Sequence, residues 1–183
     1  MSESPRERYF WNYFGMNKYI KSLTYAIFDF DYTLADTSPG VFSCVNYALS
    51  KLGFPETTYE KSSQTIGLSL GETYASLTAK PAQEADEFIR LFIEQADKVM
   101  ADKTILFEYT PAVVWRLKQL DLRLAIVSTK FRYRIEEILE RESLRSRFEV
   151  IIGGEDVSIH KPNPESLSLA MDKLGAKNTI PSM

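Results

Sequence analysis

The most constraining stretch of the chain is a short apolar run that ends in two acids one residue apart. The run from Tyr25 to Phe28 predicts a buried strand, and Asp29 and Asp31 follow it. Side chains alternate along a strand, so the two carboxylates would point the same way if the strand continued. Buried acids are costly unless a cation or hydrogen-bond donors neutralise them, and open α/β sheets bind ligands at the carboxyl ends of strands. The stretch therefore predicts a metal-assisted site in which one carboxylate attacks and the other handles protons.

Composition excludes several classes of protein. With 183 residues, of which 44% are hydrophobic, the chain fits one domain or a core with a modest insertion. A net charge of −3 does not suggest a surface for nucleic acid or anionic membranes. Cys44 and His160 are the only residues of their types, which excludes a disulfide framework, a cysteine zinc site and a histidine-clustered metal site. The chain has no apolar run of membrane-spanning length and no signal peptide at its start, so we expect a cytoplasmic protein.

Residues 38–103 show helical periodicity and no convincing strand. Helix starts are predicted at Ser38 followed by Pro39, at the capping boxes Thr57–Glu60 and Ser69–Glu72, and at Pro81. A helical block of this length between two strands is too long for a simple crossover. We therefore expect an inserted helical subdomain.

Strands and helices alternate in the second half of the chain. Buried strands are predicted at 123–128 and 149–152, and helices begin near Thr110-Pro111, Phe131 and Asn163-Pro164. This alternation predicts an α/β fold with a parallel sheet and right-handed crossovers. The helix from Phe131 to Glu142 carries mixed charges that we interpret as a solvated face: Arg132, Arg134, Glu136, Glu137 and Arg141.

Three strand ends carry residues suited to catalysis. After Asp29 and Asp31, the second strand ends in Ser128-Thr129-Lys130, and the third leads to Lys161 within His-Lys-Pro-Asn-Pro-Glu. In this order they resemble the first three motifs of the haloacid dehalogenase (HAD) superfamily. The helical block lies between the first and second motifs, where that family carries a helical cap.

The resemblance implies a parallel HAD-like core formed by residues 22–37 and 104–183. Residues 38–103 would form an all-α cap of the phosphoglycolate-phosphatase-like type, and residues 1–21 would be an N-terminal extension. The core would be incomplete at its C-terminus.

The resemblance also implies a role for each motif residue. Asp29 would be the nucleophile that forms an aspartyl-phosphate, and Asp31 would protonate the leaving group and then activate water. Mg²⁺ would be held by the carboxylate of Asp29 and the backbone carbonyl of Asp31. The phosphoryl group would be held by the remaining motif residues, which are Thr33, Ser128, Thr129 and Lys161.

Two departures from the family pattern stand out. Tyr32 occupies a position that is commonly glycine, which strains the backbone if the turn requires a positive φ. The acidic fourth motif has no counterpart, because no acid follows Asp172 in the sequence. Glu155 and Asp156 are the nearest substitutes, although a solvated loop is the simpler interpretation of both. The strand expected beside the first is missing as well, which leaves a sheet edge open to self-association.

The leading functional hypothesis is a Mg²⁺-dependent phosphatase that acts on a small phosphorylated metabolite. A sugar-phosphate phosphomutase of the same family is one alternative. The other is an inactive or partner-dependent fragment, which the missing fourth motif favours. Cap loops decide the substrate in this family, and their sequence here contains no code that names it.

Overall fold

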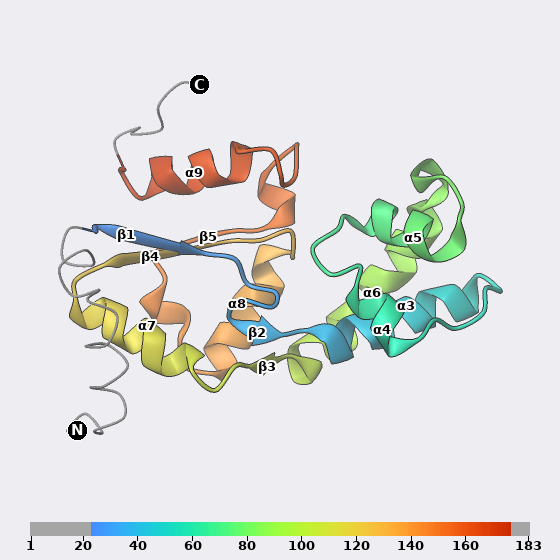
Figure 1. The fold of residues 1–183 in the computed structure, drawn as a ribbon, viewed down its shortest axis with the longest axis horizontal. Helices are drawn as coiled ribbons and strands as arrows, with labels where there is room; N and C mark the ends of the chain where they lie inside the picture. The colour runs from blue at the N-terminus through green and yellow to red at the C-terminus, as the bar shows by residue number, and fades with distance from the viewer. Residues whose placement is uncertain (1–22, 177–183) are drawn as a thin grey trace.

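The computed structural model describes residues 23–176, with a three-stranded parallel sheet at its centre in the order β1-β4-β5 (Figure 1). The strands are β1 (Tyr25–Phe28), β4 (Arg123–Val127) and β5 (Val150–Ile152). Each lies within one residue of its predicted bounds. Phe28 is in register with Ile126, and Val127 with Ile152, so the carboxyl ends of all three strands share one edge. The predicted α/β fold with a parallel sheet is confirmed.

Helices cover both faces of the sheet. The helices are α7 (Thr110–Gln119) and α8 (Arg132–Arg141) on one face and α9 (Glu165–Lys173) on the other (Figure 1). Alternate residues of β4 serve the two faces, as the period of a strand requires. Leu124 and Ile126 pack in one apolar cluster with α7 and α8, whereas Ala125 and Val127 pack in another with α9. The sheet is therefore buried on both sides, as is usual for parallel sheets.

Four helices form a second lobe with its own apolar cluster (Figure 1). They are α3 (Ser38–Lys51), α4 (Tyr59–Ser63), α5 (Leu70–Thr78) and α6 (Asp86–Lys103). We call this lobe the cap and the other described residues the core. Phe88, Leu49 and Met100 are among its largest fully buried side chains. The predicted segment 38–103 encloses these helices, while the division into domains stays a prediction and residues 1–21 lie outside the described part.

A two-stranded antiparallel ribbon joins the two lobes. Strand β2 (Ala35–Asp36) precedes the cap and pairs with β3 (Ile105–Leu106), which follows it. Next to this ribbon, the Thr110 hydroxyl donates to the Leu34 carbonyl at 2.7 Å. The two crossings between core and cap therefore run side by side (Figure 1). Strands of two residues carry no periodic pattern, and the sequence did not predict them.

Helix starts were predicted with mixed success. The capping box at Ser69 is confirmed, because Glu72 N–H donates to its hydroxyl and its own N–H donates to the Glu72 carboxylate. The box at Thr57 is wrong, since the neighbouring Thr58 is the N-cap and accepts the Lys61 N–H at 3.3 Å. Both candidates are threonines, so the residue type could not decide between them.

Three other predicted starts are displaced. Ser38 is the first residue of α3 and not its N-cap, which is Thr37. Pro81 precedes a 3₁₀ turn, Ala82–Glu84, and the long helix α6 begins only at Asp86. The last helix begins at Glu165, just after Asn163-Pro164.

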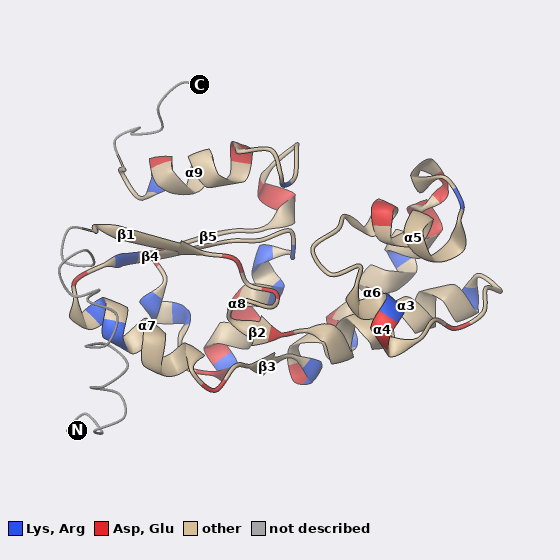
Figure 2. Cartoon of the chain, viewed as in Figure 1, with Lys and Arg blue, Asp and Glu red and all other residues tan. Residues whose placement is uncertain are grey.

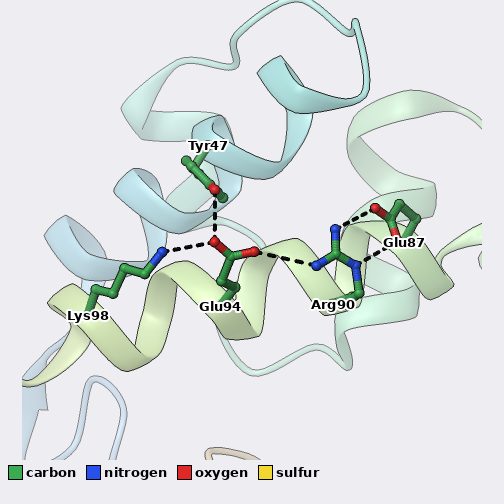
Figure 3. Close-up of polar contacts among 5 residues, drawn as sticks. All are labelled: Tyr47, Glu87, Arg90, Glu94 and Lys98. Atoms are coloured by element: carbon green, nitrogen blue, oxygen red, sulfur yellow. Dashed lines mark hydrogen bonds and ion pairs between the residues drawn. The ribbon is translucent and has the colours of Figure 1, made fainter.

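Charged residues are spread over the helices and loops of both lobes (Figure 2). On α6, Glu94 accepts the Lys98 ammonium at 2.8 Å and the Tyr47 hydroxyl of α3 at 3.1 Å, and Arg90 pairs with Glu87 (Figure 3). These pairs are exposed and contribute little to stability individually. The Tyr47–Glu94 hydrogen bond nevertheless links the two helices that form most of the cap's packed interior.

Candidate active site

The carboxyl edge of the parallel sheet brings the three predicted motifs together. Asp29 follows β1 directly, Ser128 follows β4, and the loop after β5 carries Lys161. The Lys161 ammonium lies 3.1 Å from Asp29 Oδ2 and donates to the Val127 carbonyl at 2.9 Å. One lysine thus joins the ends of β1 and β4 to the loop that follows β5.

A tight turn after β1 separates the environments of the two acids. The Phe30 carbonyl accepts the N–H groups of the turn at 2.9–3.2 Å, and the residue at its corner, Tyr32, has a φ of 58°. The strain expected at Tyr32 is therefore present, and the side chain of this residue is exposed. The side chain of Asp29 is 45% exposed, whereas that of Asp31 is only 11% exposed. Asp29 is accessible for attack, while Asp31 is recessed.

Asp31 faces a lysine of its own. The Lys130 ammonium lies 3.4 Å from Asp31 Oδ1, and the lysine side chain is only 6% exposed. This carboxylate oxygen is buried and accepts no hydrogen bond from the described residues, so the nearby ammonium is its compensating group. From the sequence, Lys130 was named at the end of the second strand but was given no role in the site. Its position directly after Ser128 and Thr129 was the available signal.

Ser128 and Thr129 end β4 beside the same edge. Ser128 is buried, and its hydroxyl accepts the Lys130 N–H at 3.2 Å. Gly154 packs against this loop so closely that a Cβ there would lie 2.5 Å from the Thr129 carbonyl oxygen. The glycine therefore allows the loop after β5 to approach the end of β4.

Two groups of predicted residues lie apart from this cluster. Thr33 is exposed on the turn, and its side chain makes no hydrogen bond to the residues between 23 and 176. Glu155 accepts the backbone N–H of Arg132 with both carboxylate oxygens, at 2.8 and 2.9 Å. Asp156 pairs with the Arg132 guanidinium at 2.7 Å and accepts the Gly153 N–H. Both acids thus anchor α8 and are committed to structural contacts.

A cavity of about 280 Å³ opens between the core and the cap. Asp31, Thr129 and Lys130 line it from the core, together with Phe131, Arg134 and His160. The cap contributes mainly apolar residues and the loop that leads into α5, which are Val41, Thr65, Ile66, Gly67, Leu68, Ser69, Leu70, Gly71, Thr73, Ile89, Phe92 and Met100. A ligand bound at the strand ends would therefore extend toward the cap.

The donor set suits a hard cation that keeps much of its water. The part of the chain that the structure describes contains no group of three or more His, Cys, Asp or Glu side chains that could hold a metal ion. Mg²⁺ needs no such cage, because it commonly binds one or two carboxylates together with water and a substrate phosphate. The half-exposed carboxylate of Asp29 and the backbone carbonyl of Asp31 are oxygen donors of the required kind.

A parallel α/β core, a helical insertion after the first strand and an acid pair at the carboxyl edge define an HAD-like hydrolase. The family model for haloacid dehalogenase-like hydrolases matches residues 26–180. The chain belongs to this family, and it is an HAD-family phosphatase.

Individual relatives agree with this assignment. The chain is 30% identical to a phosphoglycolate phosphatase of Salmonella typhi, over 87% of this chain and 72% of the relative. It is also 30% identical to the protein named "Probable phosphatase IndB" of Dickeya dadantii, over 86% of this chain and 70% of the relative. A crystal structure of a haloacid dehalogenase-like hydrolase from Bacteroides fragilis superposes with a TM-score of 0.81 at 40% identity, covering 85% of this chain and 75% of that one.

None of the helices between residues 23 and 176 has both the length and the apolar character needed to cross a membrane.

Proposed function

We propose that the chain hydrolyses a small phosphomonoester, of the kind taken by phosphoglycolate phosphatases, through an aspartyl-phosphate on Asp29. The observation that carries this proposal is the contact of 3.1 Å between Asp29 and Lys161 at the carboxyl edge of the sheet, where Asp29 is half exposed. An accessible carboxylate beside a fixed ammonium suits attack on an anionic phosphorus centre.

Both chemical steps can be written with this chain's own residues. A carboxylate oxygen of Asp29 forms a bond to phosphorus while the ester P–O bond breaks, and Asp31 gives its proton to the departing alkoxide. In the second step Asp31 takes a proton from water, the water oxygen bonds to phosphorus, and the Asp29–phosphorus linkage breaks. Asp29 is then free and Asp31 is protonated again. The recessed position of Asp31, on the wall of the cavity, supports its role on the leaving-group side.

The neighbouring residues hold the phosphoryl group. Ser128 Oγ and the Thr129 N–H would bind its oxygens, and Lys161 would offset the charge that develops on them. Mg²⁺, held by the Asp29 carboxylate and the Asp31 carbonyl, would supply charge neutralisation of the phosphate when bound.

The test is hydrolysis of p-nitrophenyl phosphate by the full chain, with Mg²⁺ and with a chelator. We expect release of p-nitrophenol that requires Mg²⁺ and is abolished by Asp29→Asn. Asp102→Asn, which changes an exposed acid of the cap, is the matched control and should retain the parent rate. Release at the parent rate by Asp29→Asn, or no Mg²⁺-dependent release by the parent, would reject the proposal.

A further inference from the structure

Arg134 is a buried cation at the boundary between core and cap. It belongs to α8, and only 5% of the residue is exposed. Its Nε and Nη2 donate to Asp97 Oδ1 of α6 at 3.2 and 2.6 Å, and Nη2 also donates to the Ile93 carbonyl at 3.2 Å. The guanidinium lies 5.1 Å from the ring centres of both Phe131 and Tyr133. These contacts fix the position of the planar group before any ligand arrives.

One end of this guanidinium is left open. Nη1 has no hydrogen-bond partner among residues 23–176, and it is not one of their fully buried unpartnered atoms. The aromatic rings and α6 cover the other sides of the group, and Arg134 lines the cavity between the lobes. The accessible N–H groups of Nη1 therefore face that cavity. Because Nη1 is accessible and has no acceptor among the described residues, it can donate to a ligand bound in the cavity.

The charges around the cavity favour an anion at this position. Two cationic side chains, Lys130 and Arg134, line the cavity. Asp31 is the single acid among its lining residues. Asp97, which pairs with Arg134, does not line the cavity, and its side chain is 49% exposed to solvent. A carboxylate entering the cavity would thus meet the Nη1 end of a guanidinium whose other two nitrogens are paired with Asp97.

We propose that Arg134 is a specificity-determining residue that binds a second anionic group on the alcohol portion of the substrate. Nη1 donates to a carboxylate of that group while the phosphate occupies the edge formed by Asp29, Ser128 and Lys161. The favoured substrates are then phosphate esters of short hydroxy acids rather than of neutral alcohols. This inference rests on the proposed function for the position of the phosphate.

The test compares the binding of two ligands that differ only in the second group. Phosphoglycolate and ethyl phosphate are phosphate esters of two-carbon alcohols, and only the first carries a carboxylate. Calorimetric dissociation constants are measured without Mg²⁺ in an Asp29→Asn background, because this substitution removes both turnover and a proposed metal ligand. We expect phosphoglycolate to bind about tenfold or more tightly than ethyl phosphate, as a charge-assisted hydrogen bond to a fixed guanidinium would produce.

Three further variants separate this role from a purely structural one. Arg134→Gln should bring the two affinities to within about threefold by weakening phosphoglycolate alone, whereas Arg134→Lys keeps the charge and should retain part of the preference. Tyr133→Phe removes a hydroxyl that contacts Asp97 and leaves the guanidinium in place, so it should retain the full preference.

Equal binding of the two ligands by the parent, or binding of neither, would overturn the proposal whether or not Arg134→Gln folds. An equal loss of affinity for both ligands in Arg134→Gln would also overturn the proposal. That result would mean that Arg134 only holds the core and the cap together and does not contact the second anionic group. Hydrolysis of p-nitrophenyl phosphate tests the proposed function separately.

Discussion

Each acid of the candidate site has a lysine of its own. Asp29 is 3.1 Å from Lys161, and Asp31 is 3.4 Å from Lys130. In the proposed mechanism Asp31 carries a proton when the substrate binds, so the two ammonium groups face the single carboxylate of Asp29. A phosphate dianion would then bring the negative charges to three against the two positive charges of the lysines. Mg²⁺ would offset this excess in the proposed mechanism.

The role of Lys161 leads to a prediction at the scale of one residue. Lys161→Met keeps the length of the side chain and removes the ammonium that contacts Asp29 and the Val127 carbonyl. We expect kcat for p-nitrophenyl phosphate to fall by about 10²–10³-fold, as for the loss of other fixed charge-stabilising donors. Steady-state kinetics measures the change, and Lys80→Met, at an exposed position of the cap, is the control. Unchanged turnover in Lys161→Met would remove this lysine from the site.

Individual residues show which parts of the candidate site could be predicted from the sequence and which could not. Asp29, Ser128 and Lys161 could be predicted because each follows a buried strand, and parallel strands bring their carboxyl ends to one edge. Arg134 could not be predicted. We interpreted it as part of a solvated face, and that interpretation is wrong because the residue is buried against α6. Only the packing of the cap on the core decides this, and a pattern within one helix does not contain it.

The strands likewise include some that could be predicted from the sequence and some that could not. The strands were predicted to within one residue because their runs are apolar and bounded by polar residues. The strands β2 and β3 were missed, since their pairing arises from the return of the chain after the whole cap. The functional roles of the site residues, and the domain division, remain predictions that the fold accommodates.

At the scale of elements, α6 and α8 are joined by a polar clasp. Asp97 accepts from Arg134 and from the Tyr133 hydroxyl, which lies 2.6 Å away. Burial alone would raise the pKa of Asp97, but the hydrogen bonds from Tyr133 and Arg134 outweigh it and lower that pKa below its ordinary value of 3.8. A lowered pKa means that the folded state favours the carboxylate. The clasp therefore stabilises the fold above pH 3.8 and loses this contribution as the pH falls through the lowered pKa.

Asp97→Asn tests the clasp. The variant should have a lower free energy of unfolding than the parent at pH 6, and the gap should narrow as the pH falls below 3.8, where the parent carboxylate becomes protonated. Urea unfolding at a series of pH values measures the gap. Asp102→Asn, one turn and a half further along α6 and exposed, should show no comparable gap. A gap for Asp97→Asn that stayed constant down to pH 2 would show that its charge does not matter.

Between residues 23 and 176 the chain forms two packed lobes, with the candidate site at their junction. The cap has its own apolar cluster, the core has one on each face of its sheet, and the ribbon of β2 and β3 connects them. The cavity draws its walls from both lobes, with the charged residues on the core side and most of the apolar ones on the cap. In the proposed function, a substrate would lie between the charged site of the core and the mainly apolar side of the cap.

This arrangement predicts that ligands stabilise the chain only in combination. Mg²⁺ and inorganic phosphate bind next to each other at the carboxyl edge, so each should bind weakly without the other. At a concentration about 100 times the dissociation constant, a ligand specific for the folded state adds about 2.7 kcal/mol. For a chain of this size that gain raises Tm by roughly 5–10 °C. We expect scanning calorimetry to show this rise with both ligands present and little change with either alone.

Lys80→Met should retain the full rise and Lys161→Met should lose most of it, because only the second variant removes a charge that faces the phosphate. The same rise in both variants would mean that phosphate binds elsewhere, whereas a rise with Mg²⁺ alone would mean that the metal site forms without the anion.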